Sequence, residues 1–246
     1  MSRHIVYFTG CFADYYGPEI GRSFVEVMER NGLRAIVPET KCCGMPQMAN
    51  SNLEGARKNF EANVRALAEA AAPGHDVLTT CPSCNLMLRR EGLPFFDGPE
   101  ARFVSERVYD ACEYLSRLHR SGRLNTDFGP LDVRVFYHNP CHLKVQEIRD
   151  AVDLLGLIPG LELAGANTAC CGMGGSYGMK KQNYDRSVAI AGKVWAEVRA
   201  SRADVVVTDC GGCGLQVQAG TGAVVRHPLA LLNEAYKAFR SVEAAG

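Results

Sequence analysis

Short apolar runs alternate along the chain with longer segments of helical period. Four runs are rich in β-branched residues, and each leads into a cysteine: HIVYFTGC at 4–11, DVLTTCPSC at 76–84, VRVFYHNPC at 133–141 and ADVVVTDCGGC at 203–213. Runs that are apolar on both faces are typical of strands in a parallel sheet. The longer segments repeat apolar residues at helical spacing over 19–32, 54–72, 148–156 and 186–202. Gly32 and Gly156 stand where two of these helices should stop.

The order of these elements predicts an α/β fold. Each half of the chain has a strand, a helix, a strand, a loop with Cys-Cys-Gly, a helix, a strand with C-x-x-C and a final helix, which indicates a mainly parallel sheet. We expect two duplicated α/β halves related by a pseudo-two-fold axis, residues 1–120 and 133–246. The polar stretch 119–132, which holds Gly and Pro, is the predicted linker. Ligands of parallel sheets collect beyond the carboxyl ends of the strands, where the cysteines are expected.

The cysteines carry the evidence for the duplication. Ten of the eleven form two sets with the same spacing: Cys11, Cys42, Cys43, Cys81 and Cys84, then Cys141, Cys170, Cys171, Cys210 and Cys213. The offset between the sets is 130 residues for the first cysteine, 128 for both members of the Cys-Cys pair and 129 for both members of C-x-x-C. Such a five-point match predicts an internal repeat. Cys112 has no counterpart; it stands at helical spacing with Val108, Leu115 and Leu118, so we expect it in the core.

Composition limits the chemistry that these cysteines can perform. The chain has 246 residues, 47% of them apolar, which is enough to fill real cores. Basic and acidic residues number 27 each, so no basic stripe offers a footprint for nucleic acid. No run of roughly 18 apolar residues predicts a transmembrane helix, and the N-terminal apolar run is too short for a signal peptide. We therefore expect a cytoplasmic protein in which structural disulfides are rare, and eleven cysteines then indicate metal or redox chemistry.

Several chemistries compete for five cysteines per half. A structural zinc site takes four ligands, commonly two C-x₂-C pairs or one such pair with histidines, and neither half has a second pair. If the C-x-x-C pair served in dithiol exchange, the other three cysteines of each set would have no function. Buried cysteines that act as small hydrophobes would not repeat at a fixed spacing. Iron–sulfur ligation fits best, because cluster irons take thiolates in groups. The glycines after each Cys-Cys pair would let the backbone pass close to a bulky inorganic core.

The two motifs, C-x30-CCG-x36-C-x2-C at 11–84 and C-x28-CCG-x37-C-x2-C at 141–213, resemble the paired CCG or cysteine-rich domains of the heterodisulfide reductase B-subunit family. The resemblance covers essentially the whole chain. Around the motifs, GCFADYYGPEIG, KCCGMPQMANSNLEGARKN, CCGMGGSYGMKKQNYDRS and ADVVVTDCGGC are most similar to the C-terminal region of the C subunits of anaerobic glycerol-3-phosphate dehydrogenases. Those proteins also carry a ferredoxin-type C-x₂-C-x₂-C-x₃-C-P segment that this sequence does not contain. We therefore expect either a stand-alone subunit or a piece of a longer chain.

The resemblance implies one [4Fe–4S] cluster per repeat, noncubane in the B subunit of heterodisulfide reductase. Each cluster would be held by the five cysteines of one set. The implied function is an iron–sulfur electron-transfer subunit of an anaerobic respiratory dehydrogenase, which passes electrons from a flavoprotein subunit towards quinone. The implied partners are that flavoprotein and a ferredoxin-type or membrane-linked subunit, with the complex at the inner face of the cell membrane. The alternative is a catalytic disulfide reductase.

Two histidines stand near the first cysteine of the second set. His142 directly follows Cys141, and His138 precedes it by three residues. Either side chain could tune a cluster by a hydrogen bond to sulfur, although strand-end and loop histidines are more often plain polar surface. Neither is therefore assigned as a ligand from the sequence.

Overall fold

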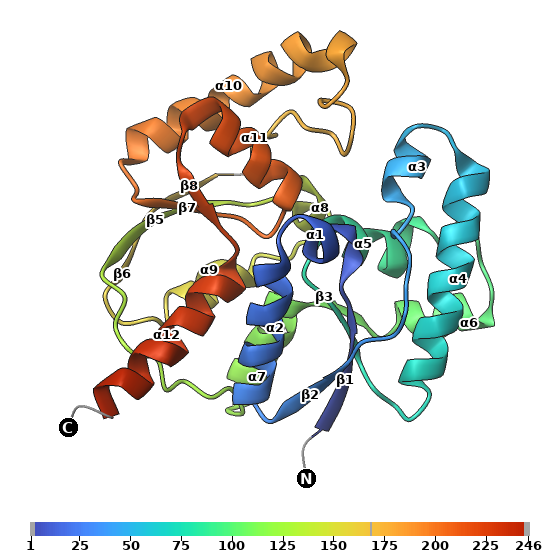
Figure 1. Cartoon of the computed structure of the whole chain (residues 1–246), viewed down its shortest axis with the longest axis horizontal. Coiled ribbons are helices and arrows are strands. Elements are labelled where there is room, and N and C mark those ends of the chain that lie inside the picture. The colour runs from blue at the N-terminus through green and yellow to red at the C-terminus, as the bar shows by residue number, and fades with distance from the viewer. Residues whose placement is uncertain (1–2, 168, 244–246) are drawn as a thin grey trace. The chain divides into compact units, whose positions relative to one another are not determined.

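A computed structural model describes residues 3–167 and 169–243 of the chain, which divides into two compact units, Met1–Arg123 and Leu124–Gly246. The elements of the first unit are β1 (Arg3–Phe8), α1 (Gly10–Tyr15), α2 (Pro18–Arg30), β2 (Leu33–Ile36), α3 (Met45–Ala49), α4 (Leu53–Ala71), β3 (Val77–Thr79), α5 (Pro82–Leu86), the π-helical turn η1 (Met87–Glu91), α6 (Pro99–Ser105), β4 (Val108–Asp110) and α7 (Ala111–Arg120). The second unit contains β5 (Val133–His138), α8 (Cys141–Lys144), α9 (Asp150–Leu155), β6 (Leu161–Asn167), the 3₁₀ turn η2 (Lys181–Asn183), α10 (Tyr184–Ser201), β7 (Val205–Val207), α11 (Gly211–Thr221), β8 (Val224–Arg226) and α12 (Pro228–Glu243) (Figure 1).

Each unit is built on a four-stranded sheet, and the strand orders correspond. The order is β2-β1-β3-β4 in the first unit and β6-β5-β7-β8 in the second, and every described pairing is parallel. Parallel neighbours require crossover connections, and the intervening helices supply them. The α/β class and the parallel sheets predicted from the sequence are confirmed, and the shared strand order agrees with the duplication.

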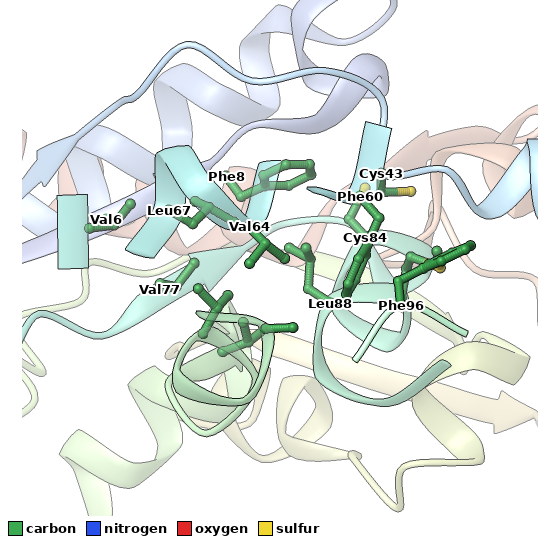
Figure 2. Packing of buried hydrophobic residues seen from close by; sticks show 14 of the residues in the cluster. Val6, Phe8, Cys43, Phe60, Val64, Leu67, Val77, Cys84, Leu88 and Phe96 are labelled. Carbon is green, nitrogen blue, oxygen red and sulfur yellow. The ribbon is translucent and has the colours of Figure 1, made fainter. Parts of the chain in front are cut away.

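Strand β1, one of the two inner strands of the first sheet, is buried on both faces over its last four residues. Val6 and Phe8 pack in a cluster with side chains of α4, including Phe60, Val64 and Leu67 (Figure 2). Tyr7, which points to the opposite face, stacks on Phe24 of α2 with ring centroids 3.9 Å apart. Alternate residues of a strand point to opposite faces, so this run can be apolar throughout only because helices cover both sides.

In the second unit, helices α10 and α11 pack on the sheet, as α4 does in the first unit. Phe136 of β5 and Val206 of β7 pack with Val194 and Val198 of α10 and with Val217 of α11. Trp195 also donates its indole N–H to the carbonyl of Gln216 at 3.1 Å. Helix α10 is therefore anchored both to the sheet and to the helix that carries the second C-x-x-C.

Several sequence expectations need correction in detail. The pattern missed β4 and β8, which pair at the far edge of each sheet. Val108 lies in β4, so it does not share a helix with Cys112; that cysteine lies in α7 and is 1% exposed, which agrees with its assignment to the core. Residues 119 and 120, expected in the linker, end α7. The predicted helix stops are confirmed: Gly32, with a left-handed φ of +70°, follows the end of α2, and Gly156, with a φ of −65°, is the C-cap of α9.

The predicted pseudo-two-fold relation between the halves stays a prediction.

No helix among the described residues combines the length and the apolar character needed to cross a bilayer.

Candidate metal centres

In each unit the cysteines follow three adjacent strands. In the first unit Cys11 lies in α1 after β1, the pair Cys42–Cys43 lies in the loop after β2, and Cys81 follows β3 as the N-cap of α5. These strands are neighbours in the order β2-β1-β3, so their carboxyl ends meet at one edge of the sheet. The fold therefore delivers all three cysteine segments of a set to the same place.

The first five sulfurs lie near one another. Cys42 forms hydrogen bonds with Cys11 and Cys43, and Cys84 forms hydrogen bonds with Cys43 and Cys81. Hydrogen bonds from Cys11 and Cys43 lower the pKa of Cys42, and the hydrogen bond from Cys84 lowers the pKa of Cys81. The same contacts raise the pKa of Cys11, Cys43 and Cys84. These mutual pKa shifts place the five sulfurs of the first set close to one another.

One buried side chain fixes the first Cys-Cys-Gly loop. Asn63 of α4 is fully buried; its Oδ1 accepts from the Lys41 N–H at 2.7 Å, and its Nδ2 donates to the carbonyls of Lys41 and Cys42 at 3.1 and 3.2 Å. Gly44 follows with a left-handed φ of +93° and caps α3. Figure 2 shows Cys43 and Cys84 beside Phe60, at one end of the apolar cluster. The loop is therefore held by a helix of the core, not by its own short segment.

Gly10 leaves room for one of the sulfurs. Its φ is +68°, and a Cβ atom added there would lie 2.8 Å from Cys84 Sγ, well inside van der Waals contact. The residue before Cys11 is thus glycine for two reasons, its left-handed backbone and the close approach of a thiol from α5.

The second set converges in the same way. Cys171 Sγ lies 3.1 Å from Cys213 Sγ, and Cys213 also hydrogen-bonds Cys210. The contact with Cys213 lowers the pKa of Cys171 to about 5 and raises that of Cys213. Burial raises the pKa of Cys141, and the charges of Cys170, Cys171 and Cys210 add to the rise, which places these sulfurs near one another.

Backbone donors and a helix side chain support the second set. The N–H of Gly172 donates to Cys170 Sγ at 3.3 Å, and the N–H of Cys213 donates to Cys210 Sγ at 3.4 Å. Ser187 of α10, which is fully buried, donates from Oγ to the Gly172 carbonyl at 2.8 Å. Gly172 has a φ of +82°, and an added Cβ would lie 2.2 Å from the Ser187 carbonyl oxygen. Glycine is therefore required at this point of the loop.

The donor set suits an iron–sulfur centre. All ten cysteines are free thiols, and each unit gathers five of them. Contacts that lower the pKa of Cys42, Cys81 and Cys171 favour the thiolate, the form that binds metal. Backbone N–H groups that donate to sulfur are among the features that set the potential of such clusters.

Two matched tyrosines near the sites were not singled out from the sequence. Tyr7 is hydrogen-bonded to Thr80 at 2.9 Å, and Tyr137 donates to Asp209 Oδ2 at 2.7 Å. Thr80 and Asp209 each precede the first cysteine of a C-x-x-C. The tyrosines are 130 residues apart, the offset of Cys11 and Cys141, so an alignment of the two halves would have found them.

Comparison with known proteins shows which family the chain belongs to. The profile of the Cysteine-rich domain, CCG, matches residues 5–89 and 135–218. The chain is 35% identical to the C subunit of anaerobic glycerol-3-phosphate dehydrogenase from Escherichia coli (strain K12), over 94% of this chain and 59% of that protein. It is 31% identical to the B subunit of fumarate reductase (CoM/CoB) from Methanothermobacter marburgensis, over 94% of this chain and 46% of that protein. It is also 29% identical to lactate utilization protein A of Shouchella clausii, over 83% and 86% of the two chains.

The chain thus spans about three fifths of the first of these relatives and about half of the second. The two matches to the family profile contain all ten converging cysteines, one set in each match. The resemblance predicted from the motifs is confirmed: this chain belongs to the CCG cysteine-rich domain family.

Proposed function

We propose that the chain is an iron–sulfur electron-transfer subunit of a dehydrogenase complex and that each unit binds one [4Fe–4S] cluster through its own five cysteines. The observation that carries the proposal is the convergence of five sulfurs in each unit. When bound, such clusters accept and release single electrons.

The protein's own residues prepare the sites for that role. Asn63 and Ser187 fix the Cys-Cys-Gly loops, so the paired thiols are positioned before a metal arrives. The sulfurs of Cys43, Cys84, Cys171 and Cys213 are buried, which keeps water from that side of each site. Low dielectric and backbone N–H donors then set the potential of a centre held there.

Partners and location belong to the same proposal. The names of the relatives, one a subunit of a glycerol-3-phosphate dehydrogenase and one a subunit of a fumarate reductase, support a place in a multi-subunit oxidoreductase. Electrons would come from a flavoprotein subunit and leave towards quinone, through protein contacts at the cytoplasmic face of the membrane. Flavoproteins take electrons from substrate in pairs, and two one-electron centres suit their onward transfer one at a time.

A disulfide reductase is a second candidate, because part of each site is open. Cys11, Cys141 and Cys170 are exposed, so a thiol or disulfide substrate could reach the sulfur-lined edge of either unit.

Anaerobic reconstitution tests the proposal. The purified chain is mixed with a flavin-bearing dehydrogenase subunit and its substrate, and the visible absorbance of the chain is followed. We expect bleaching only when both additions are present, and no oxidation of glycerol 3-phosphate, lactate or glycolate by the chain alone with a dye acceptor. Oxidation by the isolated chain would overturn the assignment, and turnover of a disulfide with a one-electron donor would favour the second candidate.

A further inference from the structure

Strand β6 is longer than its counterpart β2. It has seven residues where β2 has four, and its pairing with β5 continues past a register shift between Val135 and Phe136 to end at His138 opposite Asn167. In the first unit the pairing of β1 with β2 ends at Val6 and Ile36. The second unit therefore places a polar side chain opposite the last residue of β5.

His138 and Phe8 occupy equivalent positions in the two units. Phe8 is the last residue of β1 and His138 the last residue of β5, and each lies three residues before the first cysteine of its set. Phe8 is fully buried in the apolar cluster, and His138 is 1% exposed. A phenyl ring fills this place in one unit, so packing alone does not explain an imidazole in the other.

The hydrogen bond to Asn167 fixes the ring. His138 Nδ1 lies 2.7 Å from Asn167 Oδ1, and a carbonyl oxygen only accepts, so Nδ1 donates to it and Nε2 is the ring nitrogen that remains for another partner. Nε2 is buried and has no nitrogen or oxygen partner among the described residues. A ring nitrogen of His138, Cys171 Sγ and Cys213 Sγ all lie within 4.8 Å of one another. The ring is thus buried against two of the five sulfurs, and its contact with Cys171 is among the causes that lower the pKa of that thiol.

We propose that His138 is a metal ligand of the second centre through Nε2, with Asn167 as the residue that orients it. The second centre would then have nitrogen and sulfur ligands, and the first, which has Phe8 at this place, sulfur ligands alone. The inference rests on the proposed function to the extent that the second set of cysteines binds a metal.

Bond lengths and the second hydrogen bond of the ring support this assignment. Metal–nitrogen bonds of about 2.1 Å and metal–sulfur bonds of about 2.3 Å keep two ligands of one metal within about 4.4 Å of each other, and the ring nitrogen lies within 4.8 Å of both sulfurs before any metal draws them together. A ligating histidine ordinarily donates its other N–H to an oxygen, as His138 does to Asn167.

Pulsed electron paramagnetic resonance on chain labelled with ¹⁵N only at histidine tests the proposal. The labelled chain carries Cys42→Ser, which removes the first centre, and is brought to its paramagnetic state. We expect a ¹⁵N coupling typical of a nitrogen bonded to the metal. The coupling should vanish in His138→Phe, which installs the side chain that the first unit uses, and should persist in the matched control His142→Phe. Reverse labelling, with ¹⁴N histidine in an otherwise ¹⁵N chain, checks that the coupled nitrogen belongs to a histidine, and the His138→Phe variant assigns it to His138.

Each possible result either supports or overturns the assignment of His138 as a metal ligand. A bound cluster with no histidine coupling, or with a coupling that survives in folded His138→Phe, overturns the assignment of His138 and leaves the proposed function intact. A second unit that binds no iron in the parent chain overturns both, and metal analysis of the same samples separates the two cases. Circular dichroism establishes that each variant is folded.

Discussion

Cys171 Sγ lies 3.1 Å from Cys213 Sγ, although 42 residues separate the two cysteines. One belongs to a Cys-Cys-Gly loop and the other to the first helical turns after β7, and only the parallel order of the strands brings those segments together. The contact joins the two motifs that the sequence repeats, so loss of either sulfur should affect the whole second site.

The two sites should fail independently. Cys171→Ser should abolish the paramagnetic signal of the second centre and remove about half of the bound iron, because a serine hydroxyl is a poor replacement for a thiolate ligand. Cys42→Ser should do the same to the first centre, since Cys42 contacts both Cys11 and Cys43. Spectra and iron content of both variants check this. Loss of both signals from one substitution would show that the sites do not close within their own repeats.

Gly10→Ala should disrupt the first centre. The new methyl group would meet Cys84 Sγ at 2.8 Å, and the left-handed backbone adds strain of about 1–2 kcal/mol. Gly32→Ala is the matched control, since Gly32 has a similar φ of +70° but open space around the added Cβ. We expect both variants to lose stability in a denaturant titration and only Gly10→Ala to lose iron. Equal iron in the two would contradict a packing role for Gly10.

Asn63→Ala should loosen the first Cys-Cys-Gly loop. Asn63 bonds three partly buried backbone groups of the loop, and each hydrogen bond lost costs about 1 kcal/mol. Asn52→Ala removes a side chain from the same helix, where Oδ1 of Asn52 caps α4 by accepting from the Gly55 N–H, at a cost of about 1 kcal/mol. Iron should dissociate faster from Asn63→Ala than from Asn52→Ala when a chelator is added. If iron dissociated from the two variants at the same rate, the Cys-Cys-Gly loop would not control how long the metal is retained.

Cys112→Ser should leave both centres in place. Cys112 is buried in α7, outside either set, so the substitution should cost about 1–3 kcal/mol of stability for burial of a hydroxyl. We expect a lower melting temperature with unchanged iron and sulfide. A drop in iron content would show that this cysteine takes part in a site.

The sequence predicts the class of fold and the grouping of the cysteines because both depend on repeated, local signals. Four apolar runs mark β1, β3, β5 and β7, and each cysteine segment follows a strand at the edge where ligands collect. Strands β4 and β8 have only three residues each, too few to show a period, and their place in the sheet depends on pairing with β3 and β7.

The supports of the sites could not be predicted in the same way. Asn63 lies 22 residues from Lys41, and the turn of α4 that points it at the loop is set by packing. The Asn167–His138 pair depends on the extra length and the register shift of β6, which no composition or period reveals. Such contacts become visible only when strands and helices are placed in space.

Iron and acid-labile sulfide analysis of the anaerobically purified chain tests the central claim most directly. If each unit binds a [4Fe–4S] cluster through its own five cysteines, the chain should contain about eight iron and about eight sulfide, and Cys42→Ser or Cys171→Ser should contain about half of each. Zinc in place of iron, or iron without sulfide, would contradict the account.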